Sequence, residues 1–172
     1  MLYGTNAVGK TSLIKALGIC VIMAQSGFYV PCESFQYYPY HYIFTRIIGN
    51  DNLFKGLSTF GVEMSELRVI INNCNKNSLI LGDELCSGTE IDSALAIFMT
   101  SLEIMVKQKS NFIFATHFHE LQQLKEMKNI KNISCKHLKV LFDHEKQKLY
   151  FDRKLENGQG ETIYGLEVCK SL

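Results

Sequence analysis

Hydrophobic and polar positions along the chain follow two periods, which predicts helices and strands in turn. Apolar residues fall three or four positions apart over 60–71 and again over 91–105, the spacing of amphipathic helices. The short apolar runs at 78–81 and 112–115 have the length of buried strands. An apolar segment over 13–23 predicts a further helix near the N-terminus. Alternating strands and helices indicate an α/β domain built on a mostly parallel sheet.

The C-terminal part of the chain has the pattern of paired strands. Apolar residues alternate with polar ones over 138–142 and over 149–155, on either side of a polar turn at 143–147. This pattern predicts a C-terminal β-hairpin. Thr89, followed three positions later by Asp92, resembles a capping box and predicts the start of the second amphipathic helix. Neither an internal repeat nor a linker is visible, so we expect one domain over residues 1–172.

The composition is that of a globular domain. Of the 172 residues, 47% are hydrophobic and 20% are charged, so the chain can bury a core and intrinsic disorder is excluded. No apolar run reaches the ~18 residues that span a bilayer, so we expect no membrane contact. The net charge of +1 does not favour polyanion binding by bulk electrostatics. A slight excess of Lys and Arg after residue 100 favours a solvated basic region over a nucleic-acid surface.

The cysteines and histidines do not form a recognisable structural metal site. The six cysteines contain no CxxC pair, which argues against a zinc site and against a disulfide framework. Their use is typical of a reducing intracellular compartment. His117 and His119 would share one face of a strand, but no third ligand lies near them in sequence, so a metal site on this pair is disfavoured.

A segment near the N-terminus matches the phosphate-loop pattern GxxxxGK[ST] in full. Its glycines let successive backbone N–H groups approach phosphate oxygens, and the following helix directs the positive end of its dipole at the anion. Lys10 would reach the β- and γ-phosphates, and the Thr11 hydroxyl would ligate Mg²⁺. A chance glycine-rich turn is the alternative, and the apolar helix that follows argues against it. The predicted phosphate-binding residues are Gly4, Thr5, Asn6, Ala7, Val8, Gly9, Lys10, Thr11 and Ser12.

The phosphate loop should follow a buried strand, yet only three residues precede Gly4. We therefore expect the strand that feeds the loop to be shortened and the chain to be an N-terminally truncated fragment. Such a fragment could bind nucleotide weakly or fold only against a partner. A nucleotide-binding but catalytically inactive chain therefore stays an alternative.

Two adjacent carboxylates follow the apolar run at 78–81. Asp83 is predicted to hold Mg²⁺, since a hard cation takes oxygen ligands. Glu84 is predicted to polarise the attacking water as a general base. An acidic surface turn is the alternative, and the phosphate loop about seventy residues upstream favours the site. Gly82 interrupts the apolar run just before these carboxylates.

His117 directly follows residues 112–116, at the end of the strand predicted there. Open α/β sheets bind ligands at the carboxyl ends of their strands. His117 is therefore predicted to hydrogen-bond a γ-phosphate or the attacking water. An ordinary loop histidine is the alternative.

Together these residues resemble the ATPase domain of the MutS family of DNA mismatch repair proteins. The phosphate loop corresponds to the family's GPNMGGKST, and residues 27–31 match its GxYVP. Residues 45–64 reproduce the family's TR…D.L..G.STF..EM at identical spacing. The amino-acid sequences of the loop and of residues 83–90 are most similar to those of the subgroup found in giant viruses and octocoral mitochondria. The match continues in order through Asp83-Glu84, Gly88-Thr89, Phe114-Ala115-Thr116-His117 and Tyr164-Gly165-Leu166.

The resemblance implies an ABC-type P-loop ATPase that uses ATP and Mg²⁺. Family members work as dimers whose sites are each built from two subunits. Ser58 would then act in trans, facing the γ-phosphate held by a second MutS-like subunit, and residues 89–92 would line the interface. Mismatched double-stranded DNA would be bound by domains N-terminal to this one, which we expect to lie outside this chain. ATP state would control that binding in the parent protein.

Several positions depart from the family pattern. Thr5 replaces a proline, and Ala7 and Val8 replace Met-Gly, so the shape of the loop is expected to differ. Ile48 replaces a glycine. Ser87 replaces an arginine beside the Gly-Thr turn, which removes any salt bridge at that position.

The nucleotide-binding subunit of another ABC-type machine, such as a transporter, is a further alternative. That subunit would carry a Ser-Gly-Gly-Gln-like signature. Residues 58–60 of this chain read Ser-Thr-Phe, which argues against it.

Overall fold

A six-stranded sheet organises the computed structural model, which describes residues 1–4, 8–47, 59–86, 88–118, 120–121, 124, 127, 129–143, 145–146 and 148–160. The strand order is β2-β3-β4-β1-β5-β8. All neighbouring pairs are parallel except β5 and β8, which are antiparallel. The predicted α/β fold with a mostly parallel sheet is therefore confirmed. The strands are β1 (Leu2–Tyr3), β2 (Tyr42–Arg46), β3 (Ser78–Asp83), β4 (Asn111–Thr116), β5 (Lys136–Leu138) and β8 (Leu155–Asn157).

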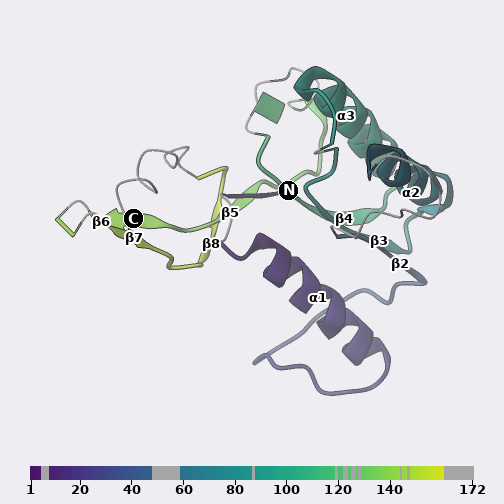
Figure 1. The fold of residues 1–172 in the computed structure, drawn as a ribbon. Coiled ribbons are helices and arrows are strands. Elements are labelled where there is room, and N and C mark those ends of the chain that lie inside the picture. Colours follow the sequence, from purple (N-terminus) through teal and green to yellow (C-terminus); the bar gives the residue numbers. More distant parts are fainter. Residues whose placement is uncertain are drawn as a thin grey trace.

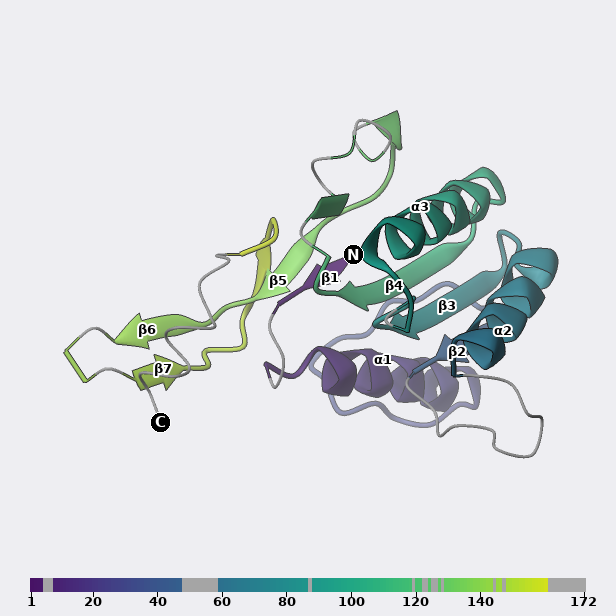
Figure 2. The same cartoon turned by 45° about the horizontal axis from the view of Figure 1, so that its top comes forward.

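Helices cover both faces of the sheet (Figures 1 and 2). The helix α1 (Lys10–Gln25) lies on one face, and α2 (Thr59–Asn73) and α3 (Ile91–Lys107) lie together on the other. The residues of β3 alternate between the two layers, because successive side chains of a strand point to opposite faces. Leu79 and Leu81 pack in the core on the α1 side, and Ile80 packs in the core under α2 and α3. All six residues of β3 are buried, as expected of a parallel strand between two helical layers.

Three features differ from the sequence-based expectation. The helix α1 begins at Lys10, inside the phosphate-loop motif, rather than at residue 13. The predicted capping box at residues 89–92 is wrong, because Glu90 is the N-cap of α3 and makes no side-chain cap hydrogen bond. The strand β2 lies in an aromatic-rich stretch for which the pattern predicted no element. It is an edge strand that is only partly buried, with Ile43 packing on the α1 side and Phe44 on the side of α2 and α3, so its residues show no clean alternation.

The predicted C-terminal hairpin is divided between two sheets. The strand β5 joins the main sheet beside β1 and pairs antiparallel with β8. Beyond them, β6 (Leu141–Asp143) and β7 (Lys148–Tyr150) form a separate antiparallel pair that extends away from the main sheet (Figures 1 and 2).

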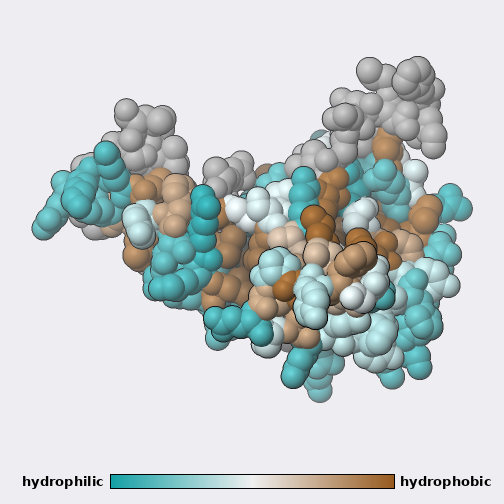
Figure 3. Space-filling view, turned by 90° about the horizontal axis from the view of Figure 1, so that it is seen from below, coloured by the Kyte–Doolittle hydropathy of each residue, from teal (hydrophilic) through white to brown (hydrophobic). Residues whose placement is uncertain are grey.

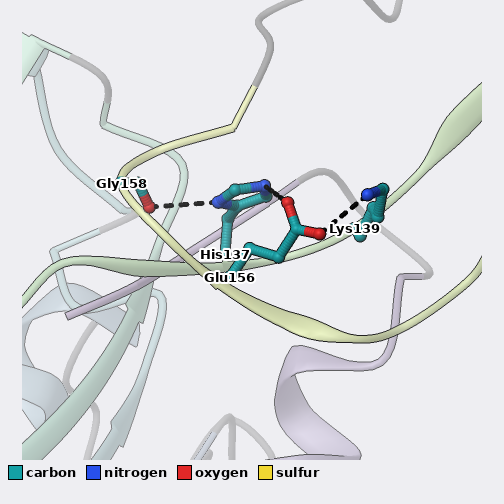
Figure 4. A network of polar contacts seen from close by, with 4 residues as sticks. All are labelled: His137, Lys139, Glu156 and Gly158. Carbon is teal, nitrogen blue, oxygen red and sulfur yellow. Dashed lines mark hydrogen bonds and ion pairs between the residues drawn. The ribbon is translucent and has the colours of Figure 1, made fainter.

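Polar contacts join β5 to β8 and the residue after it (Figure 4). The imidazole of His137 lies between the Gly158 carbonyl oxygen, 3.3 Å from Nδ1, and the Glu156 carboxylate, 3.9 Å from Nε2. Lys139 Nζ donates to the other oxygen of Glu156 at 2.7 Å. This hydrogen bond lowers the pKa of Glu156 and raises the pKa of Lys139. The ion pair is exposed, so it orients the strands more than it stabilises them.

The outer surface of α1 is partly apolar. Figure 3 views the molecule from below Figure 1, the side on which α1 lies, and shows brown hydrophobic surface among the teal. Leu13, Ile19 and Ile22 are the large apolar residues that this helix exposes. Within the described residues, no helix combines the length and apolarity needed to cross a membrane.

Gly82, which interrupts the apolar run of β3, is explained by its neighbour on β4. Gly82 lies opposite Phe114 in the β3–β4 register, and a Cβ at Gly82 would lie 2.2 Å from the Phe114 ring. The ring is fully buried and packs edge-on against Phe98, with 5.5 Å between centroids. The ring could therefore move aside only by displacing buried neighbours such as Phe98.

We expect Gly82→Ala to lower the free energy of unfolding by about 1–3 kcal/mol, because overpacking forces buried side chains out of place. Urea denaturation measures the change. Phe114→Leu makes room for the added methyl, so the double variant should lose less than the sum of the two single losses. Gly88→Ala is the control, since the atom nearest to its Cβ would be at an ordinary 3.6 Å. Equal losses at Gly82 and Gly88 would contradict the packing explanation.

Candidate functional site

The candidate site lies where three neighbouring strands end. Ala115 on β4 is the register partner of Leu2 on β1 and of Asp83 on β3. Parallel strands end at the same edge of a sheet, so the residues that leave these strands meet there. The structure thereby brings Gly4, Glu84 and His117 to one edge, with β4 between the other two strands.

The phosphate-loop motif leads from β1 into α1. Gly9 is the N-cap of the helix with φ 108°, a conformation that favours glycine. The Leu13 N–H donates to the Gly9 carbonyl at 3.0 Å and closes the first helical turn. No acidic residue lies in that turn, so the positive end of the helix dipole is not neutralised there. The exposed Ser12 is also in this turn, and residues 5–7 lie outside the described residues.

Lys10 is folded back onto the loop. Its Nζ donates to the Gly4 carbonyl oxygen at 2.6 Å, and the residue is only 4% exposed. Burial lowers the pKa of the Lys10 ammonium, and the carboxylates of Glu84 and Asp83 oppose that shift. Gly4 has φ 145°, and a Cβ there would lie 3.1 Å from the buried Val8 side chain. The loop therefore places one cation beside the two acidic residues.

Thr11 and Asp83 form the second part of the site. The Thr11 hydroxyl donates to Asp83 Oδ2, which joins the first turn of α1 to the end of β3. Asp83 is 2% exposed, and its other oxygen, Oδ1, has no hydrogen-bond partner among the described residues. A buried carboxylate oxygen without a partner is rare, because its desolvation is not compensated. A hydroxyl beside such an oxygen fits the oxygen ligands that Mg²⁺ prefers.

Glu84 begins a turn with an unusual backbone. Its φ is 49° and that of Cys86 is 65°, so two non-glycine residues adopt left-handed conformations. The Glu84 N–H donates to the Ala115 carbonyl at 3.0 Å, which fastens the turn to β4. Glu84 itself is half-buried, and its carboxylate interacts electrostatically with the Lys10 ammonium. Strained backbone of this kind persists where the surrounding structure imposes it, often at functional sites.

Two charged residues that sequence reasoning left without a role support this turn. The Cys86 N–H donates to Glu63 Oε1 of α2 at 2.7 Å. Arg46, the last residue of β2, has its Nη2 3.9 Å from the same oxygen. Both residues belong to the stretch that resembles the MutS pattern. The one signal available in the sequence was their matched position in that pattern, which does not say that they touch.

The remaining predicted residues are placed as follows. His117 is exposed at the end of β4, with its ring 4.7 Å from that of Phe118. Ser58, predicted to act in trans, lies outside the described residues, as does His119. No cluster of three or more His, Cys, Asp or Glu that could hold a metal ion occurs within the described part of the chain.

Comparison with known proteins gives consistent matches along the whole chain. The family model of MutS domain V matches residues 1–172. A putative DNA mismatch repair protein mutS homolog of Acanthamoeba polyphaga mimivirus is 43% identical over 100% of this chain and 16% of its own length. The mitochondrial DNA mismatch repair protein mutS homolog of Sarcophyton glaucum is 40% identical over 98% of this chain and 17% of its own length. The DNA mismatch repair protein MutS of Prochlorococcus marinus (strain NATL2A) is 38% identical over 99% of this chain and 18% of its own length.

The fold and the site define an α/β domain whose phosphate-loop motif joins an inner strand to a helix, beside acidic residues at the end of a nearby strand. The chain belongs to the MutS family, in the part described as domain V. The viral and octocoral relatives agree with the subgroup that the sequence resembled. The chain spans less than a fifth of the length of these curated relatives.

The alkylation rate of the Cys86 thiol tests the structure of the turn after β3. Burial raises the pKa of this thiol to about 12, the Glu63 carboxylate adds to the rise, and Arg46 opposes it. The thiolate is the reactive form, so iodoacetamide at pH 8 should modify Cys86 at least ~10³-fold more slowly than the exposed Cys32. Mass spectrometry of the alkylated peptides measures both rates. Unfolding in urea should make the two rates similar, whereas rapid reaction of Cys86 in the native protein would contradict the described turn.

Proposed function

We propose that this chain is the ATP-binding and ATP-hydrolysing domain of a MutS-like DNA mismatch repair protein. The observation that carries the proposal is the convergence of Lys10, the Thr11–Asp83 pair and Glu84 at one edge of the sheet. These groups come from two separate segments, the start of α1 and the end of β3, and have the chemistry that triphosphate hydrolysis needs. The names of the relatives support the assignment to mismatch repair.

Nucleotide binding would use the loop and the start of α1. The N–H groups of the first turn would donate to phosphate oxygens, aided by the uncompensated helix dipole. Lys10 would exchange the Gly4 carbonyl for the β- and γ-phosphates, which replaces a neutral acceptor with a charged one. Thr11 and Asp83 would hold Mg²⁺, which supplies positive charge to the phosphates when bound.

Hydrolysis would depend on the residues that leave β3 and β4. Glu84 would accept a proton from the attacking water as the general base. His117, exposed at the end of β4, would hydrogen-bond the γ-phosphate or that water. Ser58 of a second subunit would complete the site in trans, as the family resemblance implies.

The wider role belongs to the parent protein. There, the state of the nucleotide would control binding to mismatched double-stranded DNA through segments outside this chain. A dimer of MutS-like subunits would join the two nucleotide sites. Family membership, rather than a feature of this fold, supports both points.

Lys10→Ala should weaken ATP binding by ~10- to 100-fold, because a charge-assisted hydrogen bond contributes roughly 1.5–3 kcal/mol. Isothermal titration of ATP into the protein measures the change. Lys15→Ala is the matched control, since Lys15 is exposed on the same helix. Equal affinity in wild type and Lys10→Ala would refute the phosphate-loop assignment.

Glu84→Gln should keep ATP affinity and lower the hydrolysis rate by ~10²–10⁴-fold, the usual contribution of a positioned base. Phosphate release under single-turnover conditions measures the rate. Glu103→Gln, on the exposed side of α3, is the control. Should Glu84→Gln hydrolyse ATP at the normal rate, the base would be another group, with His117 as the next candidate.

A further inference from the structure

The turn that carries Glu84 is held from two sides. On the side of the sheet, the Glu84 N–H donates to the Ala115 carbonyl at 3.0 Å. On the side of the helices, the Cys86 N–H donates to Glu63 Oε1 at 2.7 Å. The left-handed residues of the turn, at positions 84 and 86, need such support, because neither is glycine. The carboxylate of Glu63 is thus one of two anchors for the backbone of the general base.

Burying the carboxylate of Glu63 costs free energy, so its position calls for a specific role. Its carboxylate is buried, at 3% exposure, and a buried charge is tolerated only when it is paired and hydrogen-bonded. Arg46 supplies the pairing, with its Nη2 3.9 Å from Glu63 Oε1 and its Nε 3.1 Å from the exposed Glu66. Arg46 lies opposite Gly82 in the β2–β3 register, one residue before Asp83 on β3. The Arg46–Glu63 pair therefore lies beside the end of β3, where the turn with Glu84 begins.

The turn also touches the start of α2. Gly88 lies against Phe60, since a Cβ at Gly88 would be 3.6 Å from Phe60 Cβ and 3.9 Å from its backbone nitrogen. Phe60 is the second residue of α2, and Glu63 lies one turn further along the same helix. The N-terminal part of α2 thus meets the turn after β3 at two points, through Glu63 at Cys86 and through Phe60 at Gly88. A displacement of this helix end would be passed to the backbone of Glu84.

We infer that Glu63 is a positioning residue for Glu84: its carboxylate, paired with Arg46, binds the Cys86 N–H and couples the start of α2 to the catalytic turn. This inference rests on the proposed function, in which Glu84 is the base. Glu63 does not touch the nucleotide in this scheme and acts only through the turn. Its loss should therefore slow the chemical step and leave ATP binding unchanged.

The test compares variants of Glu63 in the complete gene product. Glu63→Met keeps the length of the side chain but cannot accept the Cys86 N–H, whereas Glu63→Gln keeps an acceptor oxygen. Single-turnover hydrolysis should fall ~10- to 100-fold in Glu63→Met, the range expected for a misplaced catalytic group. It should stay within about threefold of wild type in Glu63→Gln. ATP affinity by titration should stay within about twofold in both variants.

Two further comparisons separate positioning from a merely structural role. In a Glu84→Gln background, Glu63→Met should cause no additional loss of rate, because residues that act through one another are not additive. Alkylation of Cys86 should be faster in Glu63→Met than in Glu63→Gln, since the turn has lost an anchor. Glu66→Met is the control on the same helix, because it removes the other partner of Arg46 and leaves the Cys86 contact in place.

The outcomes distinguish this inference from the proposed function. Normal hydrolysis by Glu63→Met, or an undiminished loss in the Glu84→Gln background, would overturn the positioning role while the proposed function stands. Absence of ATP hydrolysis in wild type would overturn both. If Glu63→Met does not fold, Glu63→Asp keeps the charge beside Arg46 and shortens the reach to Cys86. That variant should still lose about tenfold in rate, and an unchanged rate would again overturn the inference.

Discussion

The pairing of β4 with both β1 and β3 is the constraint on which the rest of the site depends. Ala115 is opposite both Leu2 and Asp83, so β1, β3 and β4 end at the same side of the sheet. This common end brings together the phosphate loop, the two acidic residues and His117. A slip of one residue in either pairing would turn every side chain of that strand to the other face. In the case of β3, Leu79 and Leu81 would leave the α1 core, and Asp83 would leave Thr11. The same hydrophobic alternation that fixes the fold therefore fixes the geometry of the site.

Several departures from ordinary folding rules occur at this edge of the sheet. A lysine is almost fully buried, one carboxylate oxygen of Asp83 has no partner among the described residues, and Glu84 and Cys86 are two of the described non-glycine residues with left-handed backbone conformations. Each of these features costs free energy in an isolated domain, and none is needed to close the hydrophobic core. Their occurrence together, where the strands end beside the phosphate-loop motif, supports the proposed site, which would need groups preorganised for an anion and a cation.

The sequence predicted the parts of this structure that depend on local pattern. The common location of the phosphate-loop motif, Asp83, Glu84 and His117 could be predicted because each is a motif or follows an apolar run, and because parallel strands end at a common edge. The ion pair of Arg46 with Glu63 was not found, since it joins segments of the chain that only the sheet register and helix packing bring together. The start of α3 was misplaced because Glu90 takes the N-cap position without a side-chain bond, a choice that propensity does not favour. Ser58 stays a prediction, since it lies outside the described residues.

The two acidic residues, although adjacent in sequence, are held by different elements. Asp83 is the last residue of β3 and is joined to Thr11 of α1, so its position follows from the sheet and from the phosphate-loop helix. Glu84 lies just beyond the strand, in a turn whose far side is held by a carboxylate of α2. Groups that would hold Mg²⁺ are thereby fixed independently of the group that would activate water. A shift of α2 relative to the sheet would therefore move Glu84 without disturbing Thr11 and Asp83. Under the proposed function, such a shift would slow hydrolysis and leave nucleotide binding intact.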